Sequence, residues 1–341
     1  MPEDAPGNPG ALPEGQGASP GASGGVRGMQ AKLHRWAGED SSRRFGDLFN
    51  LVCDPCFLAE AWMRVSGNRG ARTPGTDGVS VAQVERRDGG VSGFLAEIRG
   101  LLRSGEYRPS EVRQVMIPKR NGKLRKLGIP TLADRVVQAS LKLVLEPIYE
   151  ADFQPCSYGF RPGRRAQDAI AEIHHLSTGS RKFHWVLEAD IRACFDEIDH
   201  TALMDRFRGR IKDKRTCALV KSFLKAGIMT QTGNREDSLT GTPQGGILSP
   251  LLANIALSAL DEHFARQWEP DSEQRKKRAR KGLGNWRLIR YADDFVVMVS
   301  GTRQHAEAVR GAMSAAFLEH DLKSDSWISG MENYGARVVK A

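Results

Sequence analysis

The sequence predicts an α+β fold, and three observations lead to this prediction. Segments with the apolar period of a helix are mixed with shorter strand-like segments, without the regular strand-helix repetition of a parallel α/β sheet. Residues 112–129 have the pattern of a β-hairpin, and residues 287–299 that of a second, more apolar pair of strands. With 341 residues, of which 40% are hydrophobic and 27% charged, the chain has the composition of a globular protein of about two domains.

The N-terminal part divides into a tail and a helical region. Residues 1–28 contain eight Gly and five Pro and almost no large apolar side chain, so they are predicted to be disordered. We expect this Gly/Pro-rich tail to occupy residues 1–40. Residues 41–110 are expected to form an N-terminal helical extension, with a loop at residues 69–78 where Gly, Thr, Pro and Asp are frequent.

The period then changes to that of strands. Residues 112–117 alternate along the chain, Asn-Gly at 121–122 supplies the turn, and residues 124–129 return. Thr131 is expected to cap a long helix, after which residues 157–163 form a loop. The tip of the hairpin is basic through Lys119, Arg120, Lys123, Arg125 and Lys126.

The second half mixes strands and helices in the same irregular way. Ser-Pro at 249–250 is expected to begin a helix, because proline is favoured in the first turn. A polar stretch at residues 269–284, with six Lys and Arg, is expected to be a linker. The remaining elements are expected to be a strand at 185–191, helices at 201–208 and 213–226, strands at 287–291 and 295–299, and a last helix from Thr302.

The overall charge and the cysteines narrow the class of protein. Fifty Lys and Arg against 41 Asp and Glu give a net charge of +9, which favours a polyanionic partner, nucleic acid before anionic lipid. The sequence contains neither a membrane-spanning apolar stretch nor a secretory signal, so we expect no membrane partner and a cytoplasmic protein. The five cysteines are scattered and are expected to be reduced thiols.

Acidic residues stand out beside the apolar strands. Asp190 ends the strand at 185–191, and Asp293 and Asp294 occupy the turn between two apolar strands. Carboxylates in such surroundings are costly unless a cation or hydrogen bonds compensate them. Mg²⁺ prefers oxygen ligands, and two such ions about 3.5–4 Å apart can support in-line phosphoryl transfer. The alternatives are an ordinary turn for Asp293 and Asp294 and a strand-end cap for Asp190.

The sequence around these carboxylates resembles a known family. Tyr-Ala-Asp-Asp at residues 291–294 is similar to the catalytic box of reverse transcriptases, and its surroundings resemble the group II intron type. The similarity begins near Phe45, is strong from about residue 112 and lasts to about Phe317. Further segments resemble the fingers motifs at residues 117–131 and 157–162 and the palm motifs at residues 188–200, 241–246 and 249–254.

The resemblance implies a right-hand polymerase with a fingers-palm domain at residues 111–320. The implied activity is RNA-directed DNA synthesis that depends on Mg²⁺, with Mn²⁺ as an alternative ion. The implied partners are an RNA template, with intron RNA expected, a DNA primer and deoxynucleoside triphosphates. Asp190 and Asp293 match the metal-binding aspartates of the family, and Asp294 matches its third catalytic carboxylate.

The same resemblance implies contacts with the nucleotide and the template. Phe195 matches the bulky residue that would exclude a 2′-hydroxyl, although a core aromatic is the ordinary alternative. Gln244 matches a residue near the incoming nucleotide, with a turn hydrogen bond as its alternative. Lys123 and Arg125 would meet the triphosphate, or form a solvated hairpin tip. The expected contacts with template phosphates are Arg161, Arg164 and Arg165.

The family pattern ends after Phe317. Residues 321–341 have no recognisable counterpart and are expected to be a divergent C-terminal tail, with the thumb missing. We therefore expect the chain to be the product of a truncated or frameshifted reading frame. Without a thumb, we expect the protein to bind a primer-template duplex weakly. Two functions remain open: an RNA-directed DNA polymerase of the group II intron type, and a maturase remnant that binds intron RNA without synthesis. The three carboxylates favour the first, because a pure RNA-binding protein has no need of them.

Overall fold

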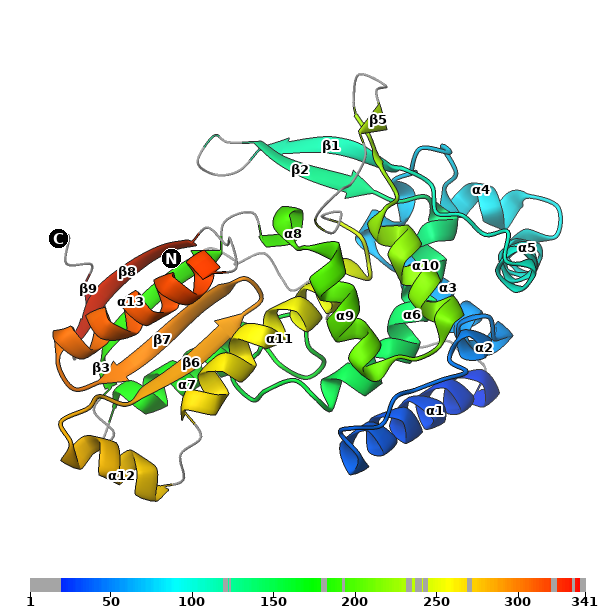
Figure 1. The fold of residues 1–341 in the computed structure, drawn as a ribbon. Coiled ribbons are helices and arrows are strands. Elements are labelled where there is room, and N and C mark those ends of the chain that lie inside the picture. Colours follow the sequence, from blue (N-terminus) through cyan, green and yellow to red (C-terminus); the bar gives the residue numbers. More distant parts are fainter. Residues whose placement is uncertain are drawn as a thin grey trace. The chain divides into compact units, whose positions relative to one another are not determined.

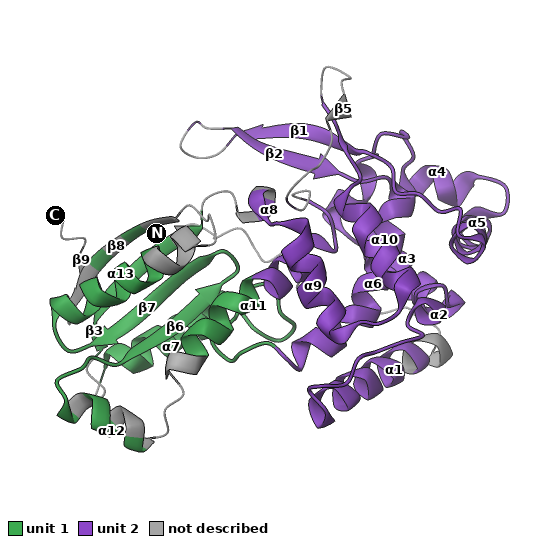
Figure 2. Ribbon diagram, viewed as in Figure 1, with its two compact units in different colours: residues 1–13, 153–194, 257–341 green, residues 14–152, 195–256 purple. Residues whose placement is uncertain are grey.

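The computed structural model of the chain consists of two compact units (Figure 2). The described residues of 153–194 and 257–341 form unit 1, and those of 20–152 and 195–256 form unit 2. The structure describes residues 20–118, 122, 124–178, 183–191, 194–230, 235–236, 241, 245–268, 272–319, 324–332 and 335–337. None of the described helices is both long and apolar enough to cross a membrane.

Unit 2 is mainly helical and carries a small sheet (Figure 1). Its sheet has the strand order β2-β1-β4-β5, in which β1 and β2 pair as the predicted antiparallel hairpin. Its strands are β1 (Val112–Pro118), β2 (Leu124–Ile129), β4 (Ile228–Met229) and β5 (Arg235–Glu236). Its helices are α1 (Pro20–Glu39), α2 (Phe49–Val52), α3 (Pro55–Ser66), η1 (Arg69–Arg72), α4 (Val81–Arg86), α5 (Gly90–Ser104), α6 (Leu132–Glu150), most of α8 (Cys194–Glu197), α9 (His200–Arg210), α10 (Lys214–Leu224) and the first part of α11 (Ser249–Trp268).

Helix α6 is the core of unit 2. It begins as predicted after Thr131, whose side chain accepts a hydrogen bond from the Asp134 amide. Asp134 is buried and accepts hydrogen bonds from the Tyr107 hydroxyl at 2.5 Å and the Thr131 hydroxyl at 2.7 Å. Burial raises the pKa of Asp134, although these hydrogen bonds oppose the shift. The start of α6 is therefore fixed both by a local cap and by a contact with a distant tyrosine.

Helix α1 corrects the prediction of a disordered tail over residues 1–40 in its second half, whereas residues 1–19 lie outside the described residues. Residues 20–39 form a regular helix in which Val26, Leu33 and Ala37 are buried. The helix lies against α6, where the Gln30 side-chain amide donates to the Leu143 carbonyl at 2.9 Å. The glycines in this stretch suggested disorder, but burial against α6 offsets the entropy they lose.

Unit 1 is built on a five-stranded sheet with the order β6-β7-β3-β8-β9. All four pairings in this sheet are antiparallel. Its strands are β3 (Phe183–Ile191), β6 (Trp286–Tyr291), β7 (Asp294–Ser300), β8 (Ser324–Glu332) and β9 (Gly335–Arg337), and its helices are α7 (Ala166–Ser177), the rest of α11, α12 (Ser272–Arg280) and α13 (Arg303–Glu319).

The two faces of this sheet bury different clusters. Leu187 and Ala189 of β3 and Val297 of β7 point to a core that α11 and α13 complete through Phe264 and Met313. The other face is covered by α7, whose contacts join a second cluster formed by Ala169, Leu176, Phe183, Ile289 and Met298. From Trp185 onward along β3, and along β7, the alternation therefore sends every second residue to each core, whereas a register shift between Phe183 and Trp185 places Phe183 in the second cluster.

Two further expectations for unit 1 are corrected. The expected divergent tail contains β8, which pairs with β3 from Ile191 opposite Ser324 to Trp185 opposite Gly330, and so extends the sheet. The expected linker contains α12, because its Lys, Arg, Glu and Gln residues are good helix formers. The Arg278 guanidinium lies 4.3 Å from the centre of the Trp286 ring, which anchors α12 to β6.

Replacing a buried residue of α1 tests whether this helix belongs to the folded unit. Leu33→Ala should lower the free energy of unfolding by about 2–5 kcal/mol, because it leaves a cavity against the core of unit 2. Chemical denaturation monitored by circular dichroism measures this change. Lys32→Ala on the exposed face is the matched control and should have almost no effect. Equal stability of the two variants would contradict the packing described for α1.

Candidate active site

The pairing of β3 with β7 brings two of the predicted carboxylate positions together. Asp190 lies directly opposite Asp294, about a hundred residues away along the chain. Cα atoms of such antiparallel partners are about 4.5–5.5 Å apart, and the two positions share one face of the sheet. Tyr291 of β6 lies opposite Asp294 on its other side, so the three positions form one row across the sheet.

This row lies on the face that α7 covers, but at the end of the sheet where the strands are exposed. Val186 and Val296 on the same face pack against the α7 cluster. Glu188 and Asp294, nearer the turn, are both exposed. The same face is thus apolar at one end and acidic at the other, which leaves the carboxylates accessible to a solvated ligand.

Asp293 occupies a two-residue turn between β6 and β7. Because Tyr291 pairs with Asp294, only Ala292 and Asp293 remain in the turn. Ala292 has a φ of 61°, whereas Asp293 has no positive φ, which is the pattern of a type II′ turn. Glycine is the usual residue at the first position, and a residue with a side chain in such a conformation costs about 1–3 kcal/mol. The surrounding structure must therefore hold Ala292 in place.

A loop at residues 156–159 packs against this turn. The Arg290 amide donates to the Cys156 carbonyl, and the Tyr158 amide donates to the Arg290 carbonyl, both at 2.8 Å. Gly159 follows directly, and a Cβ atom placed there would lie 2.2 Å from the Ala292 nitrogen. No side chain fits at that distance. The segment that resembles a fingers motif thus serves in unit 1 as a backbone support for the turn.

The carboxylate positions suit a divalent metal by the chemistry of their donors. Asp293 is half-buried and Asp294 exposed, and both offer the hard oxygen ligands that Mg²⁺ prefers. The backbone of residue 190 is located by its pairing with residue 294, whereas its side chain is not among the described side chains. The described side chains by themselves form no group of three or more His, Cys, Asp or Glu suited to a metal ion.

The residues expected near the nucleotide belong to unit 2. Arg125 is exposed on β2, opposite Ile117 of β1, and Phe195 is half-buried in the short helix α8. Lys123 and Gln244 lie outside the described residues. The described residues next to Gln244 are held tightly, because a Cβ atom at Gly245 would lie 2.4 Å from the Gly128 carbonyl oxygen.

Sequence reasoning missed Gln138, which supports the segment at Ile247 and Leu248. Its buried side-chain oxygen accepts hydrogen bonds from the Ile247 amide at 2.8 Å and the Leu248 amide at 3.4 Å. A polar residue on the buried face of α6 was the available signal, since buried polar groups are normally hydrogen-bonded.

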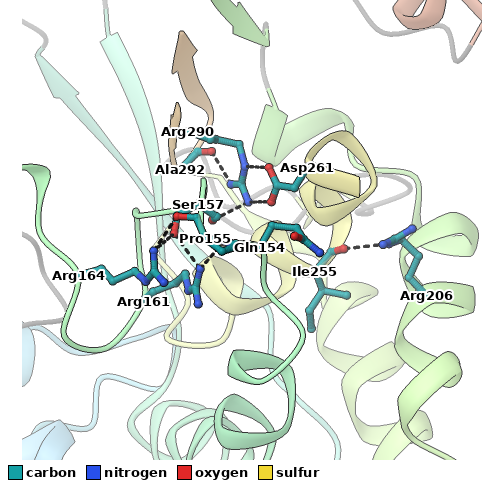
Figure 3. Close-up of polar contacts among 10 residues, drawn as sticks. All are labelled: Gln154, Pro155, Ser157, Arg161, Arg164, Arg206, Ile255, Asp261, Arg290 and Ala292. Atoms are coloured by element: carbon teal, nitrogen blue, oxygen red, sulfur yellow. Dashed lines mark hydrogen bonds and ion pairs between the residues drawn. The ribbon is translucent and has the colours of Figure 1, made fainter. Parts of the chain in front are cut away.

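Two of the three arginines expected at the template are engaged within unit 1 (Figure 3). Arg161 is 5% exposed, and its guanidinium donates to the carbonyls of Gln154 and Ser157, both at 2.8 Å. Arg164 donates to the Pro155 carbonyl at 2.8 Å. These guanidinium groups therefore bind carbonyls of their own loop, and their expected contact with template phosphates stays a prediction. Arg165 is exposed and forms an ion pair with Asp168 at 3.1 Å.

Sequence reasoning also missed a buried ion pair beside the turn. Arg290 and Asp261 are both 0% exposed, and two guanidinium nitrogens contact the two carboxylate oxygens at 2.7 and 2.6 Å (Figure 3). An arginine within the apolar strand before the turn was a sequence signal for such a pair. A charge buried in a strand requires a partner of opposite charge. The partner itself, 29 residues earlier in α11, could not be chosen from the sequence.

Comparison with known proteins assigns the class. Residues 117–323 match the family described as Reverse transcriptase (RNA-dependent DNA polymerase), which is more than half of the chain. The chain belongs to the reverse transcriptase family, as its sequence motifs predicted. Its β3–β7 pairing and the turn at Ala292 lie entirely within the matched region.

Within this family, the relatives that the chain resembles include proteins encoded by introns. It is 30% identical over 334 residues to "Group II intron-encoded protein LtrA" of Lactococcus lactis subsp. cremoris, covering 84% of this chain and 54% of that protein. It is 40% identical over 300 residues to "Protein YkfC" of Escherichia coli (strain K12), covering 83% of this chain and 78% of that protein. A third relative, "Uncharacterized 91 kDa protein in cob intron" of Schizosaccharomyces pombe, is 33% identical over 280 residues, which are 79% of this chain and 33% of that protein. The chain therefore spans about half of LtrA and a third of the fission yeast protein.

The thiol of Cys156 provides a pH-dependent test of the loop beside the turn. Burial, and secondarily the charge of Asp261, raise the pKa of Cys156 to about 12. At pH 8 iodoacetamide should alkylate the exposed Cys56 and leave Cys156 unmodified. Because the folded pKa is raised from an ordinary value of 9.0, the protonated thiol stabilises the fold below pH 9, and this contribution is lost as the pH rises toward 12. Mass spectrometry of the alkylated peptides measures the extent of modification at Cys56 and at Cys156. Equal modification of both thiols at pH 8 would contradict the prediction.

Proposed function

We propose that this chain is an RNA-directed DNA polymerase of the group II intron type. The observation that carries the proposal is the placement of Asp190 directly opposite Asp294, with Asp293 in the adjoining turn, in a chain of the reverse transcriptase family. In the proposed reaction, the 3′-hydroxyl of a DNA primer attacks the α-phosphorus of a deoxynucleoside triphosphate. A new oxygen–phosphorus bond forms, the bond to pyrophosphate breaks, and pyrophosphate leaves with the displaced electron pair.

The three carboxylates have one common role in this proposal. Asp190, Asp293 and Asp294 would hold divalent metal, Mg²⁺ or Mn²⁺, through oxygen atoms on the exposed end of the sheet. Bound metal supplies charge neutralisation at the phosphates and makes the primer hydroxyl easier to deprotonate. The contribution of the chain is to keep these oxygens fixed on one rigid sheet, so that they need not reorganise during the reaction.

The substrate contacts of the proposal come from the resemblance. Lys123 and Arg125 would bind the triphosphate, Gln244 would lie near the incoming nucleotide, and Phe195 would exclude a 2′-hydroxyl. Arg161, Arg164 and Arg165 would contact template phosphates, and Arg165 is the one of these three whose side chain is exposed. The net charge of +9 favours a nucleic-acid substrate, and the likeness to a group II intron-encoded protein makes intron RNA the expected template.

Primer extension tests the proposed activity directly. The chain should extend a DNA primer on an RNA template with deoxynucleoside triphosphates and Mg²⁺, and Asp293→Asn should lower the rate by at least about 10³-fold, because an amide replaces a metal-binding carboxylate. Addition of a chelator should abolish extension by the unaltered chain.

Glu307→Gln is the matched control for loss of one negative charge in unit 1. Glu307 is exposed on α13 and forms an ion pair with Arg303 at 3.0 Å. This variant should extend the primer at the rate of the unaltered chain. If the chain binds RNA in a salt-sensitive way without incorporating nucleotide, the alternative of an RNA-binding maturase remnant replaces the proposal.

Phe195 gives a second prediction that concerns selectivity. Phe195→Ala should raise the incorporation of ribonucleotides relative to deoxyribonucleotides by at least about tenfold, because the bulk expected beside the 2′ position is removed. Competing single-nucleotide extensions measure the ratio. Phe207→Leu, at a fully buried aromatic of α9, is the control for a general loosening of unit 2 and should leave the ratio unchanged. An unchanged ratio in Phe195→Ala would assign this ring to packing alone.

A further inference from the structure

We propose that Arg290 is a positioning residue that fixes the catalytic turn from the back of the sheet, with Asp261 and Ser157 holding its guanidinium group. The inference rests on the proposed function, because it assigns to the turn a role in nucleotide transfer. Arg290 is the last residue but one before the turn, and Asp261 lies in α11. Both belong to unit 1, as does Ser157 in the loop before α7.

The guanidinium group of Arg290 uses every one of its nitrogens. Nε and Nη2 bind the two Asp261 oxygens at 2.7 and 2.6 Å, and Nη2 also donates to the Ser157 hydroxyl at 2.8 Å. Nη1 donates to the Ala292 carbonyl at 2.8 Å. Figure 3 shows these contacts converging on one side chain. The planar fork of arginine permits this combination, whereas the single ammonium of a lysine cannot reproduce it.

The ion pair lies on the opposite face from the carboxylate row. Arg290 pairs with Phe295, which belongs to the core under α11, whereas Tyr291 pairs with Asp294 on the other face. Arg290 therefore reaches the turn through the Ala292 carbonyl and not through the reacting groups. Its effect on the reaction must pass through the position of the turn.

The energetics favour a positioning role over a purely stabilising one. A fully buried ion pair gains little net stability, because the cost of removing both charges from water offsets their attraction. The Ala292 conformation, in contrast, needs an external restraint, since its φ of 61° is costly for a residue with a side chain. The bond from Arg290 to the Ala292 carbonyl supplies that restraint at the residue before Asp293.

The loop beside the turn completes the same support. Its backbone is hydrogen-bonded to Arg290 on both sides, through the Cys156 carbonyl and the Tyr158 amide. Gly159 then meets the Ala292 nitrogen so closely that a side chain is excluded. The turn is thus held by a side chain beneath it and by a backbone beside it, and Arg290 belongs to both contacts.

Arg290→Lys is the principal test, with Arg287→Lys as its matched control. Arg287 lies on the same strand but faces α7, where it pairs with Glu172 at 3.6 Å. Arg290→Lys keeps the charge opposite Asp261 but loses the hydrogen bond to the turn. We expect the rate of single-nucleotide addition at saturating nucleotide to fall about 10²-fold, because a displacement of about 1 Å has that effect on catalysis. The KM for nucleotide should change by less than about threefold, and Arg287→Lys should retain the original rate.

Ser157→Ala is the second variant, because it leaves the ion pair intact and should fold normally. It removes one neutral hydrogen bond to the guanidinium group, so we expect a decrease of about fivefold in the same rate with the KM preserved. A loss of stability alone would reduce the amount of active protein, which active-site titration measures, and would not change the rate per active molecule. Rates equal to that of the unaltered chain in both variants would overturn the inference.

Hydrogen exchange separates failure of this inference from failure of the proposed function. Arg290→Lys should accelerate exchange in the peptide that contains residues 288–296, and should expose Cys156 to iodoacetamide at pH 8, whereas Arg287→Lys should do neither. If the unaltered chain has no polymerase activity, the proposed function fails, and these two measurements still decide whether Arg290 holds the turn. Unchanged exchange and alkylation in Arg290→Lys would refute the support itself.

Discussion

The antiparallel pairing of β3 with β7 is the constraint on which the rest of the site depends. The two strands are far apart along the chain, with helices α8 to α12 between them. Their pairing places Asp190 opposite Asp294. Side chains alternate between the two faces of a strand, so a slip of one residue would send Asp190 into the core beneath α11 and α13. The apolar residues Leu187 and Val297 oppose such a slip, because it would remove them from the core that α11 and α13 complete. The core thus fixes the geometry of the acidic end.

The same sheet shows how a fold holds a turn that its own sequence disfavours. Ala292 stands where glycine is usual, and its local preference opposes the conformation it has. Contacts from Arg290 in the strand, from Asp261 in α11 and from Gly159 in the loop before α7 compensate for this preference. Unit 1 therefore stores local strain at the position where the proposed chemistry takes place, as is usual for functional sites.

Local signals predicted much of the fold and the acidic part of the site. The alternation and Asn-Gly turn gave the β1–β2 hairpin, Thr131 gave the start of α6, and Ser249 gave the start of α11. The expectations that differ from the structure concern residues 20–39, 272–280 and 324–332, which form α1, α12 and β8. In each of these segments the composition suggested a tail or linker, whereas contacts with α6, Trp286 or β3 supply the stability that composition does not show.

What the sequence by itself determined is the family and the positions of the acidic residues: carboxylates at 190, 293 and 294 in or beside apolar strands, and a series of motifs that places the chain in the reverse transcriptase family. Only the tertiary structure decided which groups the buried arginines contact. Arg161, expected at a template, binds carbonyls of its own loop, while Arg290 and Asp261 meet beneath the turn. Residue types and local spacing are written along the chain, but the partner of a buried charge depends on which distant elements pack together.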